Sequence, residues 1–476
     1  MSAGFRWGAV CILAVVLAGP LEALDVGFGA VDITPKLGGR EKVWLAGYGT
    51  GREAAGVHDP LMARCVVLQD GRTRIALVSV DLVGLQYPAV QEIRRQLPGF
   101  SYVLVSSTHN HEGPDVIGMW GRNQFSYGVD DDYVKAVILK CADLVKATAA
   151  TMVKEVEVAY GTAEDSSLLR DTRQPTALDA VLRVLVFSGR NGKKEGLLVQ
   201  WNSHPEAMGS QNKLITADFP WATIRELTKK YQCPVVYFTG AVGGLMAPPA
   251  GPTTFEYTEK HGIEVAGLAA RAVESARSLE LTPMRVEARL LYLPVTNRLY
   301  RLGLSMGVLR RAVFSSSGDP YRKGQPMSGK NVGEVMTIET EVACLQLGEL
   351  ALASIPGELY PELVYGKFQE PADPAADFPD ASLEPTIREI LGERKWMLFG
   401  LSNDEVGYLI PKRQWDSRIP FSYGRQKAQY GETNSCGPEA TSIVMEGFAR
   451  CVAALGDSQQ EGADGKKRLG GDGSRK

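Results

Sequence analysis

The chain of 476 residues is predicted to adopt a mixed α/β fold in which sheets are covered by helices. Short apolar runs rich in β-branched residues alternate with longer runs of helical spacing, and glycine or proline marks most of the junctions. No repeat period is evident, which argues against a solenoid or a propeller. Hydrophobic residues make up 44% and charged residues 22% of the chain, which is ordinary for a soluble globular protein with a large core.

The first third of the chain is predicted to alternate between strands and helices. Strands are predicted at residues 27–33, 63–68, 75–83 and 101–107. Residues 88–97 have helical spacing, with a proline suited to the first turn. Residues 130–150 are predicted to form a long amphipathic helix, because carboxylates in its first turn complement the helix dipole.

The rest of the chain continues in the same style up to its last helix. Strands are predicted at residues 155–160, 180–188, 196–202, 234–239, 285–295, 342–347, 350–355 and 396–401. Helices are predicted at residues 221–231, 258–279 and 439–455. The polar, glycine-rich segment 315–330 is expected to be either a surface loop or a lid over a pocket.

The two ends of the chain differ from its middle. Arg6 precedes the apolar run Trp7–Leu17, and small residues follow, which is typical of a secretory signal peptide cleaved after Ala23. An uncleaved anchor is the alternative, although the run is shorter than the roughly 20 residues of a membrane span. Residues 456–476 are polar, glycine-rich and basic, which predicts a disordered tail. We therefore expect a signal peptide over 1–23, a folded domain over 24–455, and a secreted or periplasmic protein.

Charge and cysteine usage restrict the kinds of partner and site. The net charge of −3 gives no reason to expect nucleic acid or an anionic membrane surface as a partner. The cysteines that remain after cleavage are scattered and form no CxxC pattern, which argues against a zinc ribbon or a thioredoxin-like motif. Export permits disulfides, and Cys436 with Cys451 is the most plausible pair.

Histidines follow two of the predicted strands. His109 and His111 come after the strand 101–107, and their i, i+2 spacing on an extended chain would point both rings the same way. His204 follows the strand 196–202. Ligand sites of α/β proteins gather beyond the carboxyl ends of strands.

A metal site is the hypothesis that joins these residues. A single histidine after a strand is usually structural, but three of the chain's five histidines occur at such positions. Glu358, which follows the strand 350–355, adds a carboxylate, and zinc needs three or four such donors from separate elements. The other two histidines, His58 and His261, are expected to lie at the surface.

Several better-known motifs are missing from the sequence. There is no HExxH helix, and no Asp-His follows the His109-x-His111 pair. The G-x-S-x-G stretch Gly303–Gly307 does not directly follow a predicted strand, as a nucleophile elbow would. The loop Gly240–Gly244 lacks the lysine of a phosphate-binding P-loop. These absences disfavour a zincin protease, a serine hydrolase of the α/β type, a metallo-β-lactamase-like site and a P-loop nucleotide site.

The order of several motifs resembles the catalytic domain of neutral/alkaline non-lysosomal ceramidases. The resemblance covers residues 26 to 450 and stops before the immunoglobulin-like C-terminal domain of the full-length enzymes. It rests on the segments Phe28–Pro35, Leu45–Gly49, Ser79–Leu82, Ser107–Pro114, Trp201–Pro205 and Leu214–Asp218.

The resemblance implies a zinc amidohydrolase with a ceramide-like or other N-acyl lipid as substrate and transient contact with a membrane surface. It implies four zinc ligands, which are His109, His204, Glu358 and Tyr408. It also implies that His111 contacts the scissile amide and that Arg173 helps to hold the substrate. Zinc in such an open site lowers the pKa of bound water and polarises a carbonyl.

One loop departs from the family's pattern. Where ceramidases carry Gly-Asp-x-Ser-Pro-Asn, this chain reads Gly240-Ala-Val-Gly-Gly-Leu245, so Gly243 replaces the serine and Ala241 the aspartate. We expect Gly240, Gly243 and Gly244 to let the backbone approach a substrate closely, and a plain turn is the alternative. The missing serine leaves a second hypothesis open, a ceramidase-like binding protein with impaired catalysis.

A third hypothesis is a different metal-dependent hydrolase that acts on an ester or a phosphoester. A two-metal phosphoesterase needs bridging carboxylates. Asp81, Asp115 and Asp218 are the candidates, and each could equally be a structural cap or turn residue.

Overall fold

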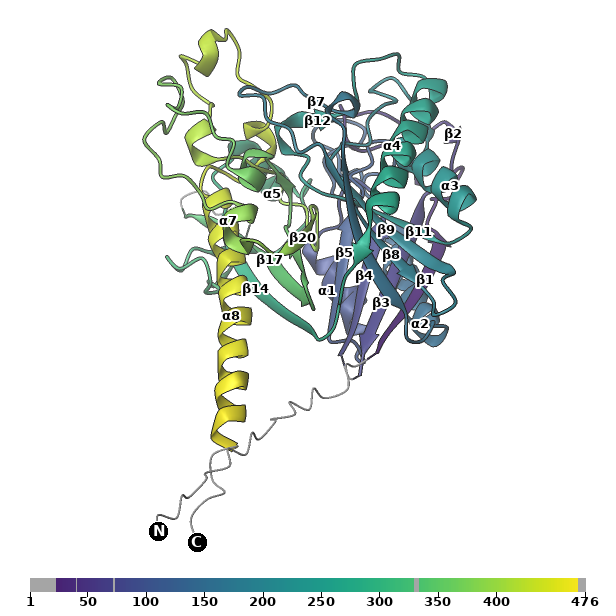
Figure 1. Ribbon diagram of the computed structural model, residues 1–476. Coiled ribbons are helices and arrows are strands. Elements are labelled where there is room, and N and C mark those ends of the chain that lie inside the picture. The colour runs from purple at the N-terminus through teal and green to yellow at the C-terminus, as the bar shows by residue number, and fades with distance from the viewer. Residues whose placement is uncertain (1–22, 40, 72, 329–333, 470–476) are drawn as a thin grey trace, which may run out of the picture.

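The computed structural model describes residues 23–39, 41–71, 73–328 and 334–469, and it confirms the predicted mixed α/β fold. Three large sheets form the body of the molecule, and helices cover their outer faces (Figure 1). The expected signal peptide falls almost entirely on residues 1–22, which lie outside the described residues. No helix among the described residues has the length and apolar character needed to cross a membrane.

The first sheet has four strands in the order β1-β3-β4-β5. Only its last pair, β4 with β5, is parallel. Its strands are β1 (Leu24–Asp32), β3 (Met62–Asp70), β4 (Thr73–Val80) and β5 (Tyr102–Ser107). Every residue of β5 is buried, as expected of a strand that reads as a continuous apolar run.

The second sheet has five strands in the order β11-β9-β8-β6-β13, and its β11–β9 pair is parallel. Its strands are β6 (Glu157–Glu164), β8 (Val181–Ser188), β9 (Lys194–Trp201), β11 (Val235–Thr239) and β13 (Arg277–Ser278). Helices α3 (Phe219–Tyr231) and α4 (Phe255–Ser275) pack over this sheet. Asp218 caps α3 by accepting a hydrogen bond from the Phe219 amide.

The third sheet is built around the long strand β17, which pairs with β14, β15 and β18. The β18–β20 pair is parallel. Its strands are β14 (Met284–Pro294), β15 (Val313–Ser315), β16 (Pro326–Met327), β17 (Met336–Leu347), β18 (Leu350–Ser354) and β20 (Lys395–Phe399). The segment 315–330, which we expected to be a surface loop or a lid, therefore contains the short strand β16.

Three short ladders and several short helices connect these sheets. The ladders are β2 (Gly56–Val57) with β10 (Leu214–Ile215), β7 (Arg170–Asp171) with β12 (Met246–Ala247), and β19 (Glu358–Leu359) with β21 (Tyr408–Leu409). The remaining helices are α1 (Tyr87–Arg95), α2 (Asp131–Ala150), α5 (Arg298–Met306), α6 (Glu362–Tyr365), α7 (Ile387–Leu391) and α8 (Ala440–Leu469).

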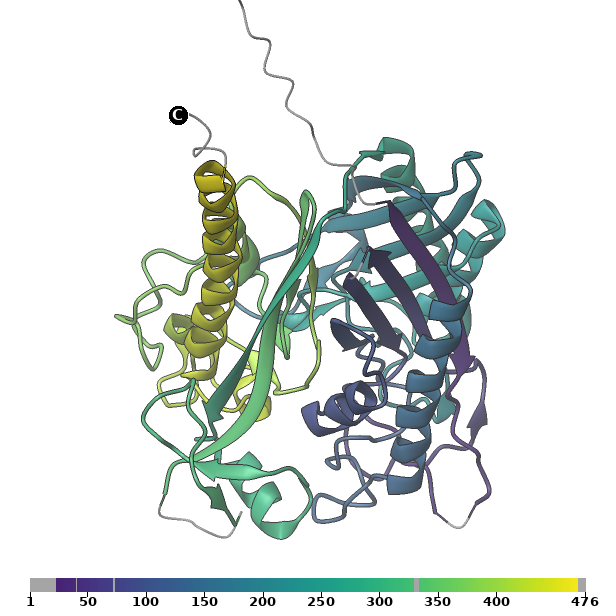
Figure 2. The same cartoon turned by 90° about the horizontal axis from the view of Figure 1, so that it is seen from below.

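The sheets pack face to face through one shared hydrophobic core. Phe238 of β11 stacks on Phe399 of β20 with ring centroids 4.0 Å apart, which joins the second sheet to the third. The Ser79 hydroxyl of β4 donates to the Tyr237 carbonyl of β11 at 2.6 Å, which joins the first sheet to the second. Helices α1 and α2 cover the outer face of the first sheet, and α8 covers that of the third (Figure 2).

Two expectations about the C-terminal region differ from the structure. Helix α8 continues to Leu469, so residues 456–469 are helical where we expected a disordered tail. Extending a formed helix costs little because each added residue gains a backbone hydrogen bond. The expected Cys436–Cys451 disulfide is wrong, because both thiols are free, and their Sγ atoms lie near different carbonyls, Val406 O at 3.2 Å and Val342 O at 3.9 Å.

Candidate metal centre

Three buried side chains from three different sheets meet beyond the carboxyl ends of their strands. His109 follows β5, His204 follows β9, and Glu358 lies just after β18 at the start of β19. Each of these strands has a parallel neighbour, so the three chain ends leave the sheets at the edge where ligand sites form. The predicted strands therefore bring these three residues together at one site.

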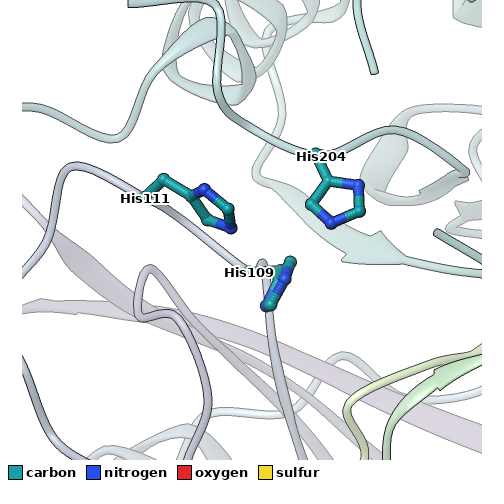
Figure 3. Close-up of side chains that lie close together, drawn as sticks. All are labelled: His109, His111 and His204. Carbon is teal, nitrogen blue, oxygen red and sulfur yellow. The ribbon is translucent and has the colours of Figure 1, made fainter. Parts of the chain in front are cut away.

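The two histidines of the first motif lie on a loop and not on the strand itself. β5 ends at Ser107, and His109 adopts a left-handed backbone with a φ of 65°. This turn, and not strand alternation, brings the rings of His109 and His111 together, with centroids 4.8 Å apart. Figure 3 shows both rings directed toward His204.

Backbone carbonyls determine that Nδ1 of His109 and Nδ1 of His204 each carry a proton. His109 Nδ1 lies 2.6 Å from the Val83 carbonyl, and His204 Nδ1 lies 2.8 Å from the Met246 carbonyl. A carbonyl oxygen only accepts hydrogen bonds, so each Nδ1 must carry a proton. In a neutral ring the lone pair is then on Nε2.

Both Nε2 atoms face the same carboxylate oxygen. Glu358 Oε2 lies 3.0 Å from His204 Nε2 and 3.3 Å from His109 Nε2. Burial tends to raise the pKa of Glu358, but the two histidines outweigh it and hold that pKa well below its usual range. Burial tends to lower the pKa of His109, but the Glu358 carboxylate outweighs it and raises the pKa. Two Nε2 atoms and a carboxylate oxygen at these distances require positive charge between them, which protons or a metal ion would supply.

His111 completes a cluster of three histidines. One ring nitrogen from each of His109, His111 and His204 lies within 4.8 Å of the others, and all three residues are buried. Zinc takes tetrahedral sets of nitrogen and oxygen donors, so this histidine cluster with the Glu358 carboxylate fits such an ion. Protonated Nδ1 atoms on carbonyls are also the usual way in which metal-binding histidines are oriented.

The His111 ring is held by packing and has no hydrogen-bond partner for either nitrogen among the described residues. Its nearest carboxylate oxygen, Glu206 Oε2, is 3.7 Å from Nδ1, too far for a hydrogen bond. Burial, with His109 and His204 nearby, lowers the pKa of His111 well below its usual value. The ring is therefore neutral, with one free donor and one free acceptor.

A glycine and a buried ion pair support the His111 segment. A Cβ on Gly47 would lie 2.3 Å from Cγ of His111, so only glycine leaves room for the ring. Arg52 Nη2 pairs with Glu112 Oε2 at 2.6 Å, and Arg52 Nη1 donates to the His111 carbonyl at 3.2 Å. Arg52 and Glu112 were not selected in the sequence, although Glu112 directly follows the second histidine.

Tyr408, the fourth residue of the predicted ligand set, is brought next to Glu358. Strands β19 and β21 pair in parallel, with Glu358 opposite Tyr408. Tyr408 is buried and lines the same pocket as His109 and Glu358. Burial and the Glu358 carboxylate raise the pKa of Tyr408 well above its usual value.

A pocket of about 710 Å³, including its open mouth, leads to these residues. Its wall is mainly apolar and aromatic, as is typical of sites for small molecules. It is formed by residues that include Val83, Ile117, Met119, Trp120, Val295, Tyr300, Leu304, Leu309, Ile338, Val406, Tyr408 and Tyr430.

Sequence reasoning missed two charged residues of this pocket, Glu405 and Arg311. Glu405 Oε1 accepts from the Gly407 amide at 2.7 Å, and its Oε2 has no hydrogen-bond partner among the described residues. Arg311 pairs with Asp404 at 2.7 Å. Asp404 and Glu405 lie only a few residues before Tyr408 in the sequence.

The glycine loop lies behind the site and outside the pocket wall. A Cβ on Gly243 would lie 2.6 Å from the Glu358 carbonyl oxygen and 2.7 Å from the Tyr360 amide nitrogen. A Cβ on Gly240 would lie 2.1 Å from Asn202 Oδ1. Gly244 has a φ of 71°, in the left-handed region that favours glycine. The loop thus supports the backbone of Glu358.

Arg173 is not brought to the histidines. It is buried and forms a two-pronged ion pair with Glu432, at 2.7 and 3.0 Å. Its remaining contacts are to the carbonyls of Tyr430 and Gln414, at 2.7 and 3.0 Å. Tyr430 lines the pocket and Arg173 does not, so Arg173 lies behind the pocket wall, in contact with the backbone of Tyr430.

The three aspartates considered for a second metal form ion pairs or hydrogen bonds outside the histidine cluster. Asp81 pairs with Arg64 at 2.8 Å. Asp115 accepts from three backbone amides of the loop that follows it, and Asp218 caps α3. None of them joins the histidine cluster or lines its pocket.

The two remaining histidines have different environments. His58 is exposed, as expected, and stacks on Phe255 with ring centroids 3.6 Å apart. The expected surface position of His261 is wrong, because its side chain is 1% exposed and packs against the ring of Phe219. Burial lowers the pKa of His261 to about 4.

Solved structures of ceramidases share this fold. Neutral ceramidase from Pseudomonas aeruginosa matches with a TM-score of 0.67 and 17% identity, over 91% of this chain and 74% of that one. A ceramidase complexed with C2 matches with a TM-score of 0.67 and 16% identity, over 92% of this chain and 76% of that one. No protein-family model matches this chain. The chain therefore has the fold of neutral ceramidase, with a buried histidine cluster that could hold a metal ion.

Proposed function

We propose that this chain is a zinc-dependent hydrolase that cleaves the amide bond of a ceramide or a related N-acyl lipid. One observation carries the proposal: the Nε2 atoms of His109 and His204 converge on one oxygen of Glu358. A divalent cation stabilises two imidazole nitrogens and a buried carboxylate that are arranged in this way. The ceramidase fold and the apolar pocket support a lipid amide as the substrate.

His109, His204, Glu358 and Tyr408 are the residues that would hold the zinc ion. When bound, zinc would polarise the substrate carbonyl and lower the pKa of a water molecule. Burial raises the pKa of the Tyr408 phenol in the site without metal, and the phenol oxygen would be the fourth donor to the ion.

His111 is the residue we assign to the scissile amide. Its ring is neutral, buried at the pocket and without hydrogen-bond partners among the described residues. One of its nitrogens would donate to the amide carbonyl as negative charge develops there, a contribution that is strongest in a dry site. Water is the proposed nucleophile, since Gly243 provides no hydroxyl.

Metal analysis of the purified protein is the first test. We expect one zinc ion per chain, and we expect its loss in His109→Ala and His204→Ala but not in the matched control His58→Ala, which alters an exposed histidine outside the cluster. A zinc content that is zero, or equal in all four proteins, would contradict the metal site.

Turnover is the second test. We expect release of fatty acid from ceramide, its loss on chelation and its return when zinc is added, with esters and N-acyl amino acids as comparison substrates. His111→Ala should retain zinc and lose most turnover, because a general acid, base or hydrogen-bond donor at the reacting bond typically contributes about 10²–10⁴-fold. Full turnover in His111→Ala would contradict its assignment.

A binding protein without catalysis is the second candidate, and Gly243 in place of the family's serine is the observation that favours it. Tight binding of ceramide by zinc-loaded protein with no product release would support this candidate. Turnover that depends on zinc would reject it.

We further propose that the protein is exported and that residues 1–23 are removed. The apolar run Trp7–Leu17 behind Arg6 supports this proposal. N-terminal sequencing of the protein from its native host should begin at Leu24, and retention of Met1 would contradict cleavage.

A further inference from the structure

Glu405 presents an unpaired carboxyl oxygen at the candidate pocket. The residue lines the pocket together with His109 and Tyr408. Its Oε1 accepts from the Gly407 amide at 2.7 Å, whereas its buried Oε2 has no hydrogen-bond partner among the described residues. Leaving a buried carboxyl oxygen unpaired is costly, so we expect a group that occupies the pocket to pair with it.

The surrounding backbone holds the Glu405 side chain in place. A Cβ on Gly84 would lie 2.6 Å from Cβ and 2.8 Å from Cγ of Glu405, so a larger residue at position 84 would displace this side chain. The backbone amide of Glu405 donates to Asp404 Oδ1 at 2.9 Å. The Gly407 amide engages one carboxyl oxygen, which leaves the other for a ligand.

The protein supplies no cation to this carboxyl group from the described part of the pocket wall. Arg311 is the only lysine or arginine that lines the pocket. Its Nη1 and Nη2 donate to the Asp404 carboxylate at 3.2 and 2.7 Å, and Nη2 also donates to the Glu339 carbonyl at 2.8 Å. A positive partner for Glu405 must therefore come with the ligand.

Aromatic rings line the same pocket. They belong to Trp120, Tyr300, Tyr408 and Tyr430. The rings of Tyr408 and Tyr430 meet edge to face with centroids 5.7 Å apart. The Tyr300 hydroxyl lies beside the residue that engages Glu405, since a Cβ on Gly407 would be 2.7 Å from it. The face of an aromatic ring attracts a cation, and proteins use aromatic cages to bind alkylammonium groups.

We propose that the pocket selects an N-acyl lipid that carries an alkylammonium group on the nitrogen side of its amide. The ammonium group pairs with Glu405 Oε2 and rests against the rings of Tyr300 and Tyr430. Ceramide, which has no charge, would leave the Glu405 carboxylate without a counter-charge and should bind less tightly. The identification of the ligand as an N-acyl lipid rests on the proposed function, and the choice of a cation rests on Glu405.

Two octanesulfonamides test this selectivity, because a sulfonamide takes the place of the amide and resists hydrolysis. One is made from putrescine and the other from aminobutanol, so they share one carbon chain and end in an ammonium or a hydroxyl group. Binding to the full chain is measured by calorimetry in the presence of added zinc. We expect the ammonium probe to bind about 10–100-fold more tightly, the range expected of a hydrogen bond between charged groups.

A charge variant tests the part played by Glu405. Glu405→Gln removes the charge, keeps the size of the side chain and should bring the affinities of the two probes together. The matched control Glu393→Gln alters an exposed glutamate outside the pocket wall and should keep the preference. Thermal melting checks that both variants fold. Equal affinities of the two probes for the unaltered protein, or a preference that survives in Glu405→Gln, would overturn the proposal.

A ring variant tests the aromatic part of the site without altering Glu405. Tyr430 is 49% exposed, so its replacement should leave the core intact. Tyr430→Leu should weaken binding of the ammonium probe by about 2–30-fold, and Tyr430→Phe, which keeps the ring, should not. Equal losses in the two variants would contradict the contact between the ammonium group and the ring.

Zinc content separates this role from metal binding. Glu405 does not belong to the histidine cluster, so Glu405→Gln should keep the zinc content of the unaltered protein. Loss of zinc in this variant would overturn the proposal, because it would make Glu405 a metal ligand. Ceramide hydrolysis by a protein that binds both probes equally would reject the ammonium site and leave the proposed function standing. A preference for the ammonium probe without any amide hydrolysis would reject the reaction and leave the ammonium site standing.

Discussion

Introducing the serine of the ceramidases by Gly243→Ser should damage the candidate metal centre. A Cβ at this position would lie 2.6 Å from the Glu358 carbonyl oxygen and 2.7 Å from both the Leu359 carbonyl carbon and the Tyr360 amide nitrogen. All three neighbours are backbone atoms, so the strand that carries Glu358 must move. Overpacking of this kind typically costs about 1–3 kcal/mol of unfolding free energy. Disturbing the support of a metal ligand typically lowers metal affinity by about 10–100-fold.

Two measurements check this prediction for Gly243→Ser, and a matched variant controls it. Zinc affinity is measured by competition with a chromogenic chelator, and unfolding free energy by denaturant titration of metal-free protein. The control is Gly267→Ser on α4, where a Cβ would meet nothing within 4 Å. Unchanged zinc affinity and stability in Gly243→Ser, or a gain in ceramide turnover, would refute the steric reasoning.

Three further predictions concern stability. Burial lowers the folded pKa of His261 to about 4, below its ordinary 6.5, so only the unfolded chain binds this proton between those values. The unfolding free energy should therefore fall by up to about 3 kcal/mol as the pH drops from 6.5 to 4. In denaturant titrations of metal-free protein, His261→Gln should show a smaller loss over the same range. An equal loss in both proteins would contradict the prediction. Arg52→Met should lower the unfolding free energy by about 3–5 kcal/mol, because it leaves Glu112 buried and unpaired. The double variant R52M/E112L should recover part of that loss. Strictly additive effects of the two substitutions on the unfolding free energy would exclude this coupling. Because the Cys436 and Cys451 thiols are free, reducing agent should leave the melting temperature unchanged, and a fall would point to a disulfide.

The strands that precede the site residues could be predicted from the sequence because most of their residues are buried. β5 and β18 are buried at every residue and β9 from Gly196 to Trp201, and each strand is followed by one of His109, His204 and Glu358. Tyr408 was predicted only from the family resemblance. The pairing of its strand with that of Glu358 brings the two residues next to each other.

Features that depend on distant partners could not be predicted in the same way. Arg173 was expected at the substrate, but its carboxylate partner Glu432 lies 259 residues away in the sequence. The burial of His261 depends on helix α3, whose Phe219 ring packs against it. Helix α5 was not predicted, and its interior residue Gly303 is unfavourable for a helix.

The candidate metal centre takes His109, His204 and Glu358 from the ends of three separate sheets. A metal ion bound there would connect the three sheets as a crosslink that no single sheet can form alone. Metal uptake during refolding would then be a late event, since it requires all three sheets to be docked. The rate of zinc uptake would consequently report on the final assembly of the molecule, separately from the formation of each sheet.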